Sequence, residues 1–341
     1  MKILFRSIIT LLFGAAVLGC AQEEKYSANE NEKEYLEAWL KTNYPGAVQA
    51  GNGIYILEDV TGNGAAYAGE EYVHVDYDAT SLDGTISSST DLETNKRIGK
   101  YTVGNYYGPK VWQIDKNTIP VGVEDMLQGM RIGGTRTALI PGWLTTYDRY
   151  KKSSDYINKV TSGTTAIYKV TLRNAFANSD KWELDSLNAY AKRNFSLNPS
   201  DTVRTGFFYI QTEKPSKDKE FPNDTTIYIN YIGRLLDGTV FDTSIADTAK
   251  FYGIYKETGS YGPVKISWAD DVLDIKMTVS SGSSSSSSTP VTGFQYTLWE
   301  MGPHEKGTGL FYSPLGYTIS GSGNSIPSYS PLRFDIEVVD N

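Results

Sequence analysis

The chain has 341 residues, 40% of them apolar, and a formal net charge of −8 at pH 7. This length suits about two domains, and the apolar content is that of a folded protein. The acidic balance argues against a nucleic-acid-binding surface. Two histidines and one cysteine argue against a zinc site or a Cys–His nucleophile pair.

The first 20 residues have the pattern of a targeting segment. Lys2 and Arg6 precede an apolar run, residues 8–17, that is too short to span a bilayer. The sequence VLGC at residues 17–20 resembles a bacterial lipobox, which implies cleavage before Cys20 and lipidation of that residue. We expect residues 1–20 to be a lipoprotein signal peptide, so that Cys20 anchors the protein in the cell envelope, periplasmic or surface-facing at the outer membrane. A plain secretory signal with an incidental cysteine is the alternative.

Residues 21–31 are polar and charged, and we expect them to form a flexible tether. Their Gln22-Glu23-Glu24 resembles the surface-export signals of some Bacteroidetes lipoproteins. Residues 32–44 carry apolar side chains at helical spacing, and Pro45-Gly46 predicts the end of that helix. A strand over residues 53–57 and a strand and turn over residues 72–86 are predicted next.

The order of these predicted elements occurs twice. Tyr77 and the turn Leu82-Asp83-Gly84 recur 154 residues later as Tyr231 and Leu236-Asp237-Gly238. The strand before each turn and the helix before each strand recur at a similar spacing, with residues 182–195 as the second helix. We interpret this as an internal duplication.

Residues 227–251 of the second copy read IYINYIGRLLDGTVFDTSIADTAKF. Their period of two, with β-branched and aromatic residues, predicts a strand that turns into a second strand. The residues alone fit two interpretations, an apolar pocket with one polar wall or a plain hairpin with core aromatics. The stretch resembles the first half of an FKBP-type peptidyl-prolyl isomerase, where a run of the form xYxGxLxDGxxFD supplies part of the proline pocket.

Later segments of both copies resemble the same family in the same order. They are residues 123–133, 139–141 and 166–172 in the first copy, and residues 291–301, 313–317, 325–327 and 332–339 in the second. The resemblance implies an α+β fold of two FKBP-like domains, residues 32–176 and 177–341. Each would be an antiparallel sheet wrapped around a short helix and preceded by a helix.

The family's pocket residues can be carried over to the second copy position by position. The resemblance implies a catalytic pocket formed by Tyr231, Phe241, Asp242, Phe251, Val291, Phe294, Tyr317, Ile326 and Phe334. The first four would come from the hairpin and the strand after it. Phe294 stands where the family usually has a pocket-floor tryptophan, and Asp247 stands where it often has an arginine that donates hydrogen bonds.

The first copy departs further from the family. Ser87-Ser88 replaces the Phe-Asp pair, Arg97 replaces the later phenylalanine, and Val123 replaces the tryptophan, although Tyr77 and Tyr168 remain. This pattern predicts a degenerate domain that serves as a scaffold or binds a partner.

By resemblance, the second domain is expected to be a prolyl isomerase and folding helper acting on proline-containing polypeptides. Such catalysis needs no cofactor and no metal, and the family resemblance also implies a possible macrolide ligand. The alternative is a non-catalytic lipoprotein that uses both domains to hold extended polypeptide, and a third interpretation is an envelope scaffold.

Residues 252–290 are longer than a typical hairpin connection, and we interpret them as an insertion. Residues 265–268 have strand character, whereas Ser280–Ser288 is of low complexity and is expected to be flexible. Either a substrate-grasping flap or a solvated excursion fits this segment. The acidic residues Asp270, Asp271 and Asp274 are interpreted as a solvated face rather than a cation site.

Overall fold

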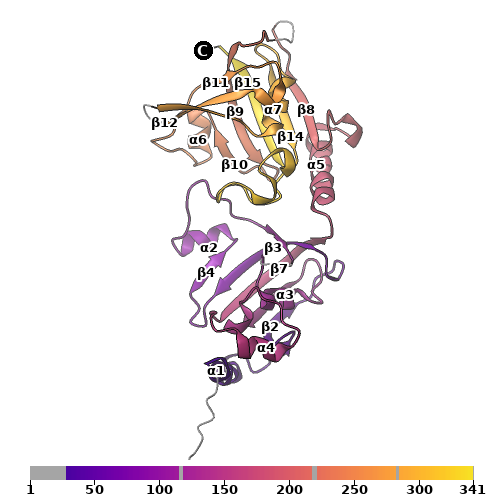
Figure 1. The fold of residues 1–341 in the computed structure, drawn as a ribbon, viewed down its shortest axis with the longest axis vertical. Helices are drawn as coiled ribbons and strands as arrows, with labels where there is room; N and C mark the ends of the chain where they lie inside the picture. The colour runs from indigo at the N-terminus through magenta and orange to yellow at the C-terminus, as the bar shows by residue number, and fades with distance from the viewer. Residues whose placement is uncertain (1–27, 115–117, 217–220, 282–283, 341) are drawn as a thin grey trace, which may run out of the picture.

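The computed structural model describes residues 28–114, 118–216, 221–281 and 284–340. The predicted signal peptide, Cys20 and most of the predicted tether lie outside the described residues. Two antiparallel sheets lie one above the other along the long axis of the molecule, each with helices packed beside it (Figure 1). The predicted α+β class is confirmed. No helix in the described part of the chain is long and apolar enough to cross a membrane.

The first sheet has the strand order β1-β2-β6-β7-β3-β4, and β5 also pairs with β3. Its strands are β1 (Val48–Ala50), β2 (Ile54–Val60), β3 (Tyr72–Thr80), β4 (Ile86–Ser89), β5 (Lys110–Gln113), β6 (Thr135–Ile140) and β7 (Ala166–Phe176). The helices of this half are α1 (Ala28–Asn43), α2 (Leu92–Arg97), α3 (Val121–Leu127) and α4 (Ser153–Lys159). Helix α1 begins at Ala28, inside the predicted tether, and its buried side chains are Leu36 and Leu40.

The second sheet has the strand order β13-β12-β11-β9-β15-β14-β8, and β10 also pairs with β9. Its strands are β8 (Phe207–Glu213), β9 (Thr226–Leu235), β10 (Val240–Thr243), β11 (Val264–Ser267), β12 (Lys276–Ser281), β13 (Ser284–Ser288), β14 (Lys306–Phe311) and β15 (Leu332–Val339). The helices are α5 (Ser179–Phe195), α6 (Ala246–Phe251) and α7 (Thr292–Trp299). Short 3-10 helices occur at Gly142–Leu144, Pro199–Asp201, Val272–Asp274, Ser313–Leu315 and Thr318–Ser320.

The two sheets repeat one topology. The order β2-β6-β7-β3 of the first sheet recurs as β8-β14-β15-β9 in the second, and β4 and β5 correspond to β10 and β11. Each of the two sheets also carries a central helix, α3 or α7, between the same strands. This repetition is what an internal duplication of the sequence predicts.

The true insertion in the second copy is narrower than residues 252–290. Lys110 and Val264, which begin β5 and β11, are 154 residues apart, whereas Val121 and Thr292, which begin α3 and α7, are 171 apart. The additional residues therefore lie between β11 and α7, where β12 and β13 form a hairpin. Strand β11 itself pairs with β9, so it belongs to the sheet shared by both copies.

In the described part of the serine run, residues 280–281 and 284–288, the backbone forms antiparallel strand pairs where the composition predicts a flexible segment. Thr278 lies opposite Ser287, and Ser281 lies opposite Ser284, in an antiparallel register. Serine composition predicts flexibility because serine buries little apolar surface, but backbone hydrogen bonding to a neighbouring strand does not depend on the side chain.

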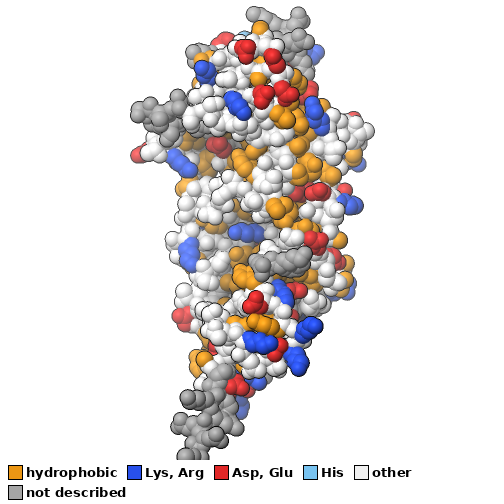
Figure 2. Space-filling model, viewed as in Figure 1, with side chains coloured by type: hydrophobic (Ala, Val, Ile, Leu, Met, Phe, Trp, Pro, Cys, Tyr) orange, Lys and Arg blue, Asp and Glu red, His pale blue; other side chains and the backbone are white. Residues whose placement is uncertain are grey.

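Apolar side chains form separate cores beneath the two sheets. The first core includes Ile54, Val75 and Leu139, all fully buried, together with the α1 residues. The second includes Phe207, Ile229 and Ile336. On the visible face of the molecule, acidic and basic side chains are interspersed rather than gathered into a patch of one sign (Figure 2).

Candidate functional site

An aromatic cluster lies on the inner face of the second sheet. The alternation of β9 directs Ile229, Tyr231 and Gly233 to the same side as the core. On the neighbouring strand β15, Phe334 pairs directly with Gly233. Helix α7 adds Phe294, which is 3% exposed.

Phe334 is at the centre of this cluster. The centroid of its ring lies 5.0 Å from that of Phe294, 5.6 Å from Phe241, 5.8 Å from Phe311 and 6.1 Å from Tyr231. The first two contacts are edge-to-face, the geometry that the aromatic quadrupole favours. Side chains from a strand hairpin, a helix and two further strands thus form one packed apolar cluster.

A β-bulge and a glycine place Phe241 in the cluster. The register of β10 on β9 shifts between Val240 and Asp242, so Phe241 is the bulged residue, and a bulge redirects a side chain. A Cβ atom added at Gly233 would lie 2.6 Å from the Phe241 ring and 2.9 Å from that of Phe334. Only glycine leaves room for both rings at this position.

The polar wall of the site is a tyrosine–carboxylate pair. The Tyr231 hydroxyl donates a hydrogen bond of 2.7 Å to Asp242 Oδ2, and the Thr243 backbone N–H holds the other carboxylate oxygen at 2.9 Å. Burial, followed by the charge of Asp242, raises the pKa of Tyr231 far above its ordinary value. Burial, with Asp242 again second, also raises the pKa of Tyr317. Both phenols therefore stay protonated at neutral pH, and Asp242 accepts rather than donates.

The remaining predicted residues close the cluster. Ile326 is 4% exposed and belongs to the same core. Val291, which precedes α7 as its N-cap, and Tyr317 are partly buried and pack against that core. The structure therefore brings together every predicted site residue except Phe251.

Phe251 does not lie in the cluster. It ends helix α6, not a strand as the sequence interpretation had it, and its side chain is 82% exposed. Its one described ring contact is with Tyr252, at 5.0 Å. The prediction that Phe251 forms a wall of the pocket is therefore wrong for this conformation of the chain.

Sequence reasoning missed two residues that shape the site. Phe311 on β14 is fully buried and stacks on Phe334, and Gly293 allows it, because a Cβ atom there would lie 2.2 Å from the Phe311 ring. Gly233 is the other: it is the glycine of the family run xYxGxLxDGxxFD, but it was not assigned to the pocket. Strand β14 is buried on both faces from Gly307 to Phe311, so it has no alternating pattern that would have indicated Phe311.

The first copy has the same frame with different side chains. The Tyr77 hydroxyl and Ser88 Oγ lie 3.1 Å apart, where the second copy has Tyr231 and Asp242. Ser87 at the bulge donates to the carbonyl of Ala79 at 2.9 Å, and the Tyr77 ring lies 5.0 Å from Trp112. The cluster of rings seen in the second copy has no counterpart of Phe241 or Phe294 here.

The acidic residues after β11 form no metal centre in the described ranges. No group of three or more His, Cys, Asp or Glu side chains there is placed to hold a metal ion. Asp271 instead accepts a 2.8 Å hydrogen bond from the Leu273 N–H at the start of a 3-10 helix. This contact gives Asp271 a structural role.

Comparison with known proteins gives one curated relative and several solved structures. No protein-family model matches the chain. A probable FKBP-type peptidyl-prolyl cis-trans isomerase, FkpA, from Neisseria meningitidis serogroup B is 28% identical over 167 residues, which are 48% of this chain and 47% of that protein. The chain therefore spans about half the length of the curated relative it matches.

Two solved structures with FKBP names align with the chain. FkpA from Escherichia coli is 22% identical with a TM-score of 0.31, covering 47% of this chain and 60% of that one. The three FKBP domains of wheat FKBP73 are 13% identical with a TM-score of 0.29, covering 84% and 94%. Over about half of its length, the chain is thus similar in sequence to an FKBP-type peptidyl-prolyl cis-trans isomerase.

Proposed function

We propose that this protein is a peptidyl-prolyl cis-trans isomerase and folding helper of the cell envelope, with its activity in a second domain spanning residues 177–341. The first domain, residues 32–176, is inactive in this proposal. The observation that carries it is the ring cluster around Phe334 with the Tyr231–Asp242 pair at its edge.

Catalysis of prolyl isomerisation requires no reactive side chain. The barrier to rotation about a prolyl amide, ~18–20 kcal/mol, comes from the resonance lost as the bond twists. An apolar surface favours the less polar twisted amide over the planar one, and this differential binding lowers the barrier without a nucleophile or a metal.

In this proposal the rings of Phe241, Phe294 and Phe334 hold the proline ring. Asp242 keeps the Tyr231 hydroxyl in one orientation and is not a general base, because its carboxylate already accepts from that hydroxyl and from the Thr243 N–H.

The difference between the copies supports the assignment of activity to the second domain. Ser87 and Val123 stand where the second copy has Phe241 and Phe294. Each aromatic side chain that is lost removes apolar surface worth ~1.5–3 kcal/mol of burial. The first copy thus lacks the apolar surface on which a twisted amide would be favoured.

A second candidate function is a non-catalytic polypeptide-binding lipoprotein. The observations that favour it are the exposure of Phe251, at 82%, and Phe294 in place of a larger tryptophan floor. The missing Phe251 wall leaves a more open site and the smaller Phe294 floor a looser one, a site that holds a proline without lowering its barrier.

An isomerisation assay on the full chain separates the two candidates. The substrate is a proline-containing tetrapeptide, whose uncatalysed exchange takes ~10–100 s. We expect the wild type to accelerate the exchange, Phe241→Ala to lower kcat/KM about tenfold or more, and Ser87→Ala at the matched position of the first copy to have no effect. Binding of the peptide without acceleration would favour the binding protein. A macrolide that competes with the peptide would further support an FKBP-type pocket.

The proposal also includes a lipid anchor at Cys20, on the sequence pattern described above. Cys20→Ala is expected to move the protein out of the membrane fraction. Retention of that variant in the membrane, at the level of the wild type, would contradict the anchor but would leave the proposed activity untouched.

A further inference from the structure

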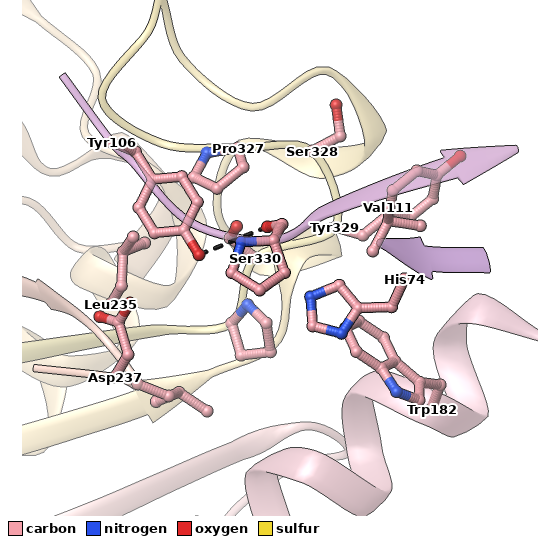
Figure 3. Close-up of a pocket in the computed structure, with 13 residues that line it drawn as sticks. His74, Tyr106, Val111, Trp182, Leu235, Asp237, Pro327, Ser328, Tyr329 and Ser330 are labelled. Carbon is pink, nitrogen blue, oxygen red and sulfur yellow. Dashed lines mark hydrogen bonds between the residues drawn. The ribbon is translucent and has the colours of Figure 1, made fainter. Parts of the chain in front are cut away.

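A loop of the first domain reaches the loop that carries two of the site residues. Residues 98–109 connect α2 to β5, and residues 316–331 are the part of the β14–β15 connection that follows the 3-10 helix Ser313–Leu315. The Tyr106 backbone N–H donates a hydrogen bond of 2.7 Å to the carbonyl of Asn324. The Tyr106 side chain packs against the core of the second domain, and Figure 3 shows its ring beside Pro327.

A second contact joins the same two parts of the chain. The ring of Tyr72 on β3 meets that of Tyr329 edge-on, with centroids 5.4 Å apart. Tyr72 is itself backed by Phe176, at 5.6 Å, which stacks on Trp182 at 4.6 Å. Tyr329 has φ of 58°, an unfavourable conformation for a residue with a side chain, which persists where surrounding contacts hold it.

These two contacts lie on either side of Ile326. Ser322 and Ile326 exchange backbone hydrogen bonds of 2.8 and 3.1 Å, which makes a tight hairpin with Asn324 in its turn. The first domain therefore contacts the loop on both sides of Ile326: at Asn324, two residues before it, and at Tyr329, three residues after it. Ile326 packs in the core of the candidate site, and Tyr317 stands at the beginning of the same loop.

The outer side of this loop faces a small cavity between the two domains. Its volume is about 130 Å³. His74 and Trp182 line one side, Tyr106 and Asp237 line another, and the loop from Pro327 to Pro331 completes it (Figure 3). On this side, Tyr106 and Tyr72 of the first domain contact the loop.

We propose that the first domain positions the proline site of the second, by holding the 316–331 loop through Tyr106 and Tyr72 so that Ile326 and Tyr317 keep their places in the cluster. Tyr106 is then a positioning residue that acts through Asn324. This inference rests on the proposed isomerase function, and it gives the inactive copy a part in the activity of the other.

The test uses the full chain and one main variant. Tyr106→Pro removes the backbone donor to Asn324, and Tyr106→Ala, which keeps the donor but removes the ring, serves if the proline variant does not fold. Tyr107→Phe is the matched control, since the Tyr107 hydroxyl contacts Thr102 and Lys100 within its own loop. Two readouts are measured: hydrogen exchange of residues 316–331, and kcat and KM for the tetrapeptide.

We expect Tyr106→Pro to speed exchange in residues 316–331 and to lower kcat/KM about fivefold, the effect of one lost hydrogen bond, while Tyr107→Phe changes neither. Unchanged exchange in this loop, or faster exchange with unchanged kcat/KM, would overturn the positioning role. A wild type without isomerase activity would refute the proposed function instead, and hydrogen exchange alone would then decide whether the first domain orders the loop.

Discussion

The Tyr231 hydroxyl donates its 2.7 Å hydrogen bond to a carboxylate, that of Asp242, whereas the equivalent hydroxyl of the first copy, on Tyr77, meets a serine hydroxyl at 3.1 Å. The same backbone frame therefore holds a charge-assisted hydrogen bond in one domain and a neutral one in the other. Charge-assisted bonds are shorter and about twice as strong. The orientation of the tyrosine is thus fixed more firmly in the second domain.

The first prediction follows from this pair. Asp242→Ala should lower kcat/KM for the tetrapeptide about tenfold or more, because Tyr231 loses a charged acceptor. Asp242→Asn should cost less, since the amide oxygen can still accept. Ser88→Ala is the control in the first copy and should leave the rate unchanged. Equal rates for the wild type and Asp242→Ala would remove Asp242 from the site.

The second prediction concerns Phe251. Since this side chain is 82% exposed on α6, Phe251→Ala should change kcat/KM by less than about twofold, within the range of surface substitutions. Phe241→Ala, measured beside it, should show the large loss. A loss of the same size for Phe251→Ala would mean that α6 folds over the site when substrate binds.

The strands of the site could be predicted because their signals are local. Tyr231 and Phe241 lie on a hairpin whose period of two and Asp-Gly turn are visible in a short window of sequence. Phe251 was misplaced because the family pattern gives its position in the chain, whereas its exposure depends on whether residues 246–251 coil into a helix. Gly233 is visible in the family run, but its packing role could not be predicted because the rings beside it, Phe241 and Phe334, come from other strands.

In the predicted insertion, too, local composition and long-range pairing indicate different structures. Ser280–Ser288 has the composition of a flexible segment, but β13 pairs with β12, whose residues supply the partner hydrogen bonds. Ile266 and Ile275, also assigned to the insertion, are fully buried in the second core. Tertiary pairing outweighs strand propensity in such cases.

The third prediction separates these parts of the predicted insertion. Replacing Ser280–Ser288 with a short Gly/Ser linker should leave the melting temperature within a few degrees, because β13 is an edge strand of small side chains. Ile266→Ala should lower the free energy of unfolding by about 2–5 kcal/mol, since it opens a cavity in the core. Thermal melts followed by circular dichroism measure both. Loss of the second domain on the linker replacement would show that the hairpin supports the core.

The fourth prediction concerns a buried carboxyl group that joins α5 to the loop after β14. Glu183 is 1% exposed and accepts hydrogen bonds of 2.7 Å from the N–H and the hydroxyl of Ser313. Burial is the main cause that raises its pKa above the usual 4.5. The folded state therefore binds this proton more tightly than the unfolded state, so its contribution to stability is fully present below pH 4.5 and is lost as pH rises through the folded-state pKa.

Glutamine has the shape of protonated glutamate and can make both bonds to Ser313. We expect Glu183→Gln to match the wild type in acid and to become the more stable protein as pH rises toward 8. Asp185→Asn, which alters an exposed ion pair with Lys181 on the same helix, is the control for general charge effects. Urea unfolding at a series of pH values measures the difference, and a difference that does not change with pH would contradict the raised pKa.

The last prediction concerns Gly233 and Phe241, which differ together between the copies. The first copy has Ala79 and Ser87 at these positions, and Ala79 pairs with Ser88 as Gly233 pairs with Asp242. An alanine is tolerated beside the small serine. An alanine at position 233 is not tolerated beside Phe241, because its Cβ atom would lie 2.6 Å from the Phe241 ring.

Gly233→Ala should therefore displace Phe241, lower the free energy of unfolding by about 1–3 kcal/mol through overpacking, and lower kcat/KM. Gly46→Ala, where an added Cβ meets no atom within 4 Å, is the control. The double variant Gly233→Ala/Phe241→Ser reproduces these two positions of the first copy. It should recover part of the stability without the activity, because it removes the clash with the Phe241 ring while the Phe334 ring stays 2.9 Å from the added Cβ atom. Activity that returned together with stability would show that Phe241 is packing and not part of the proline site.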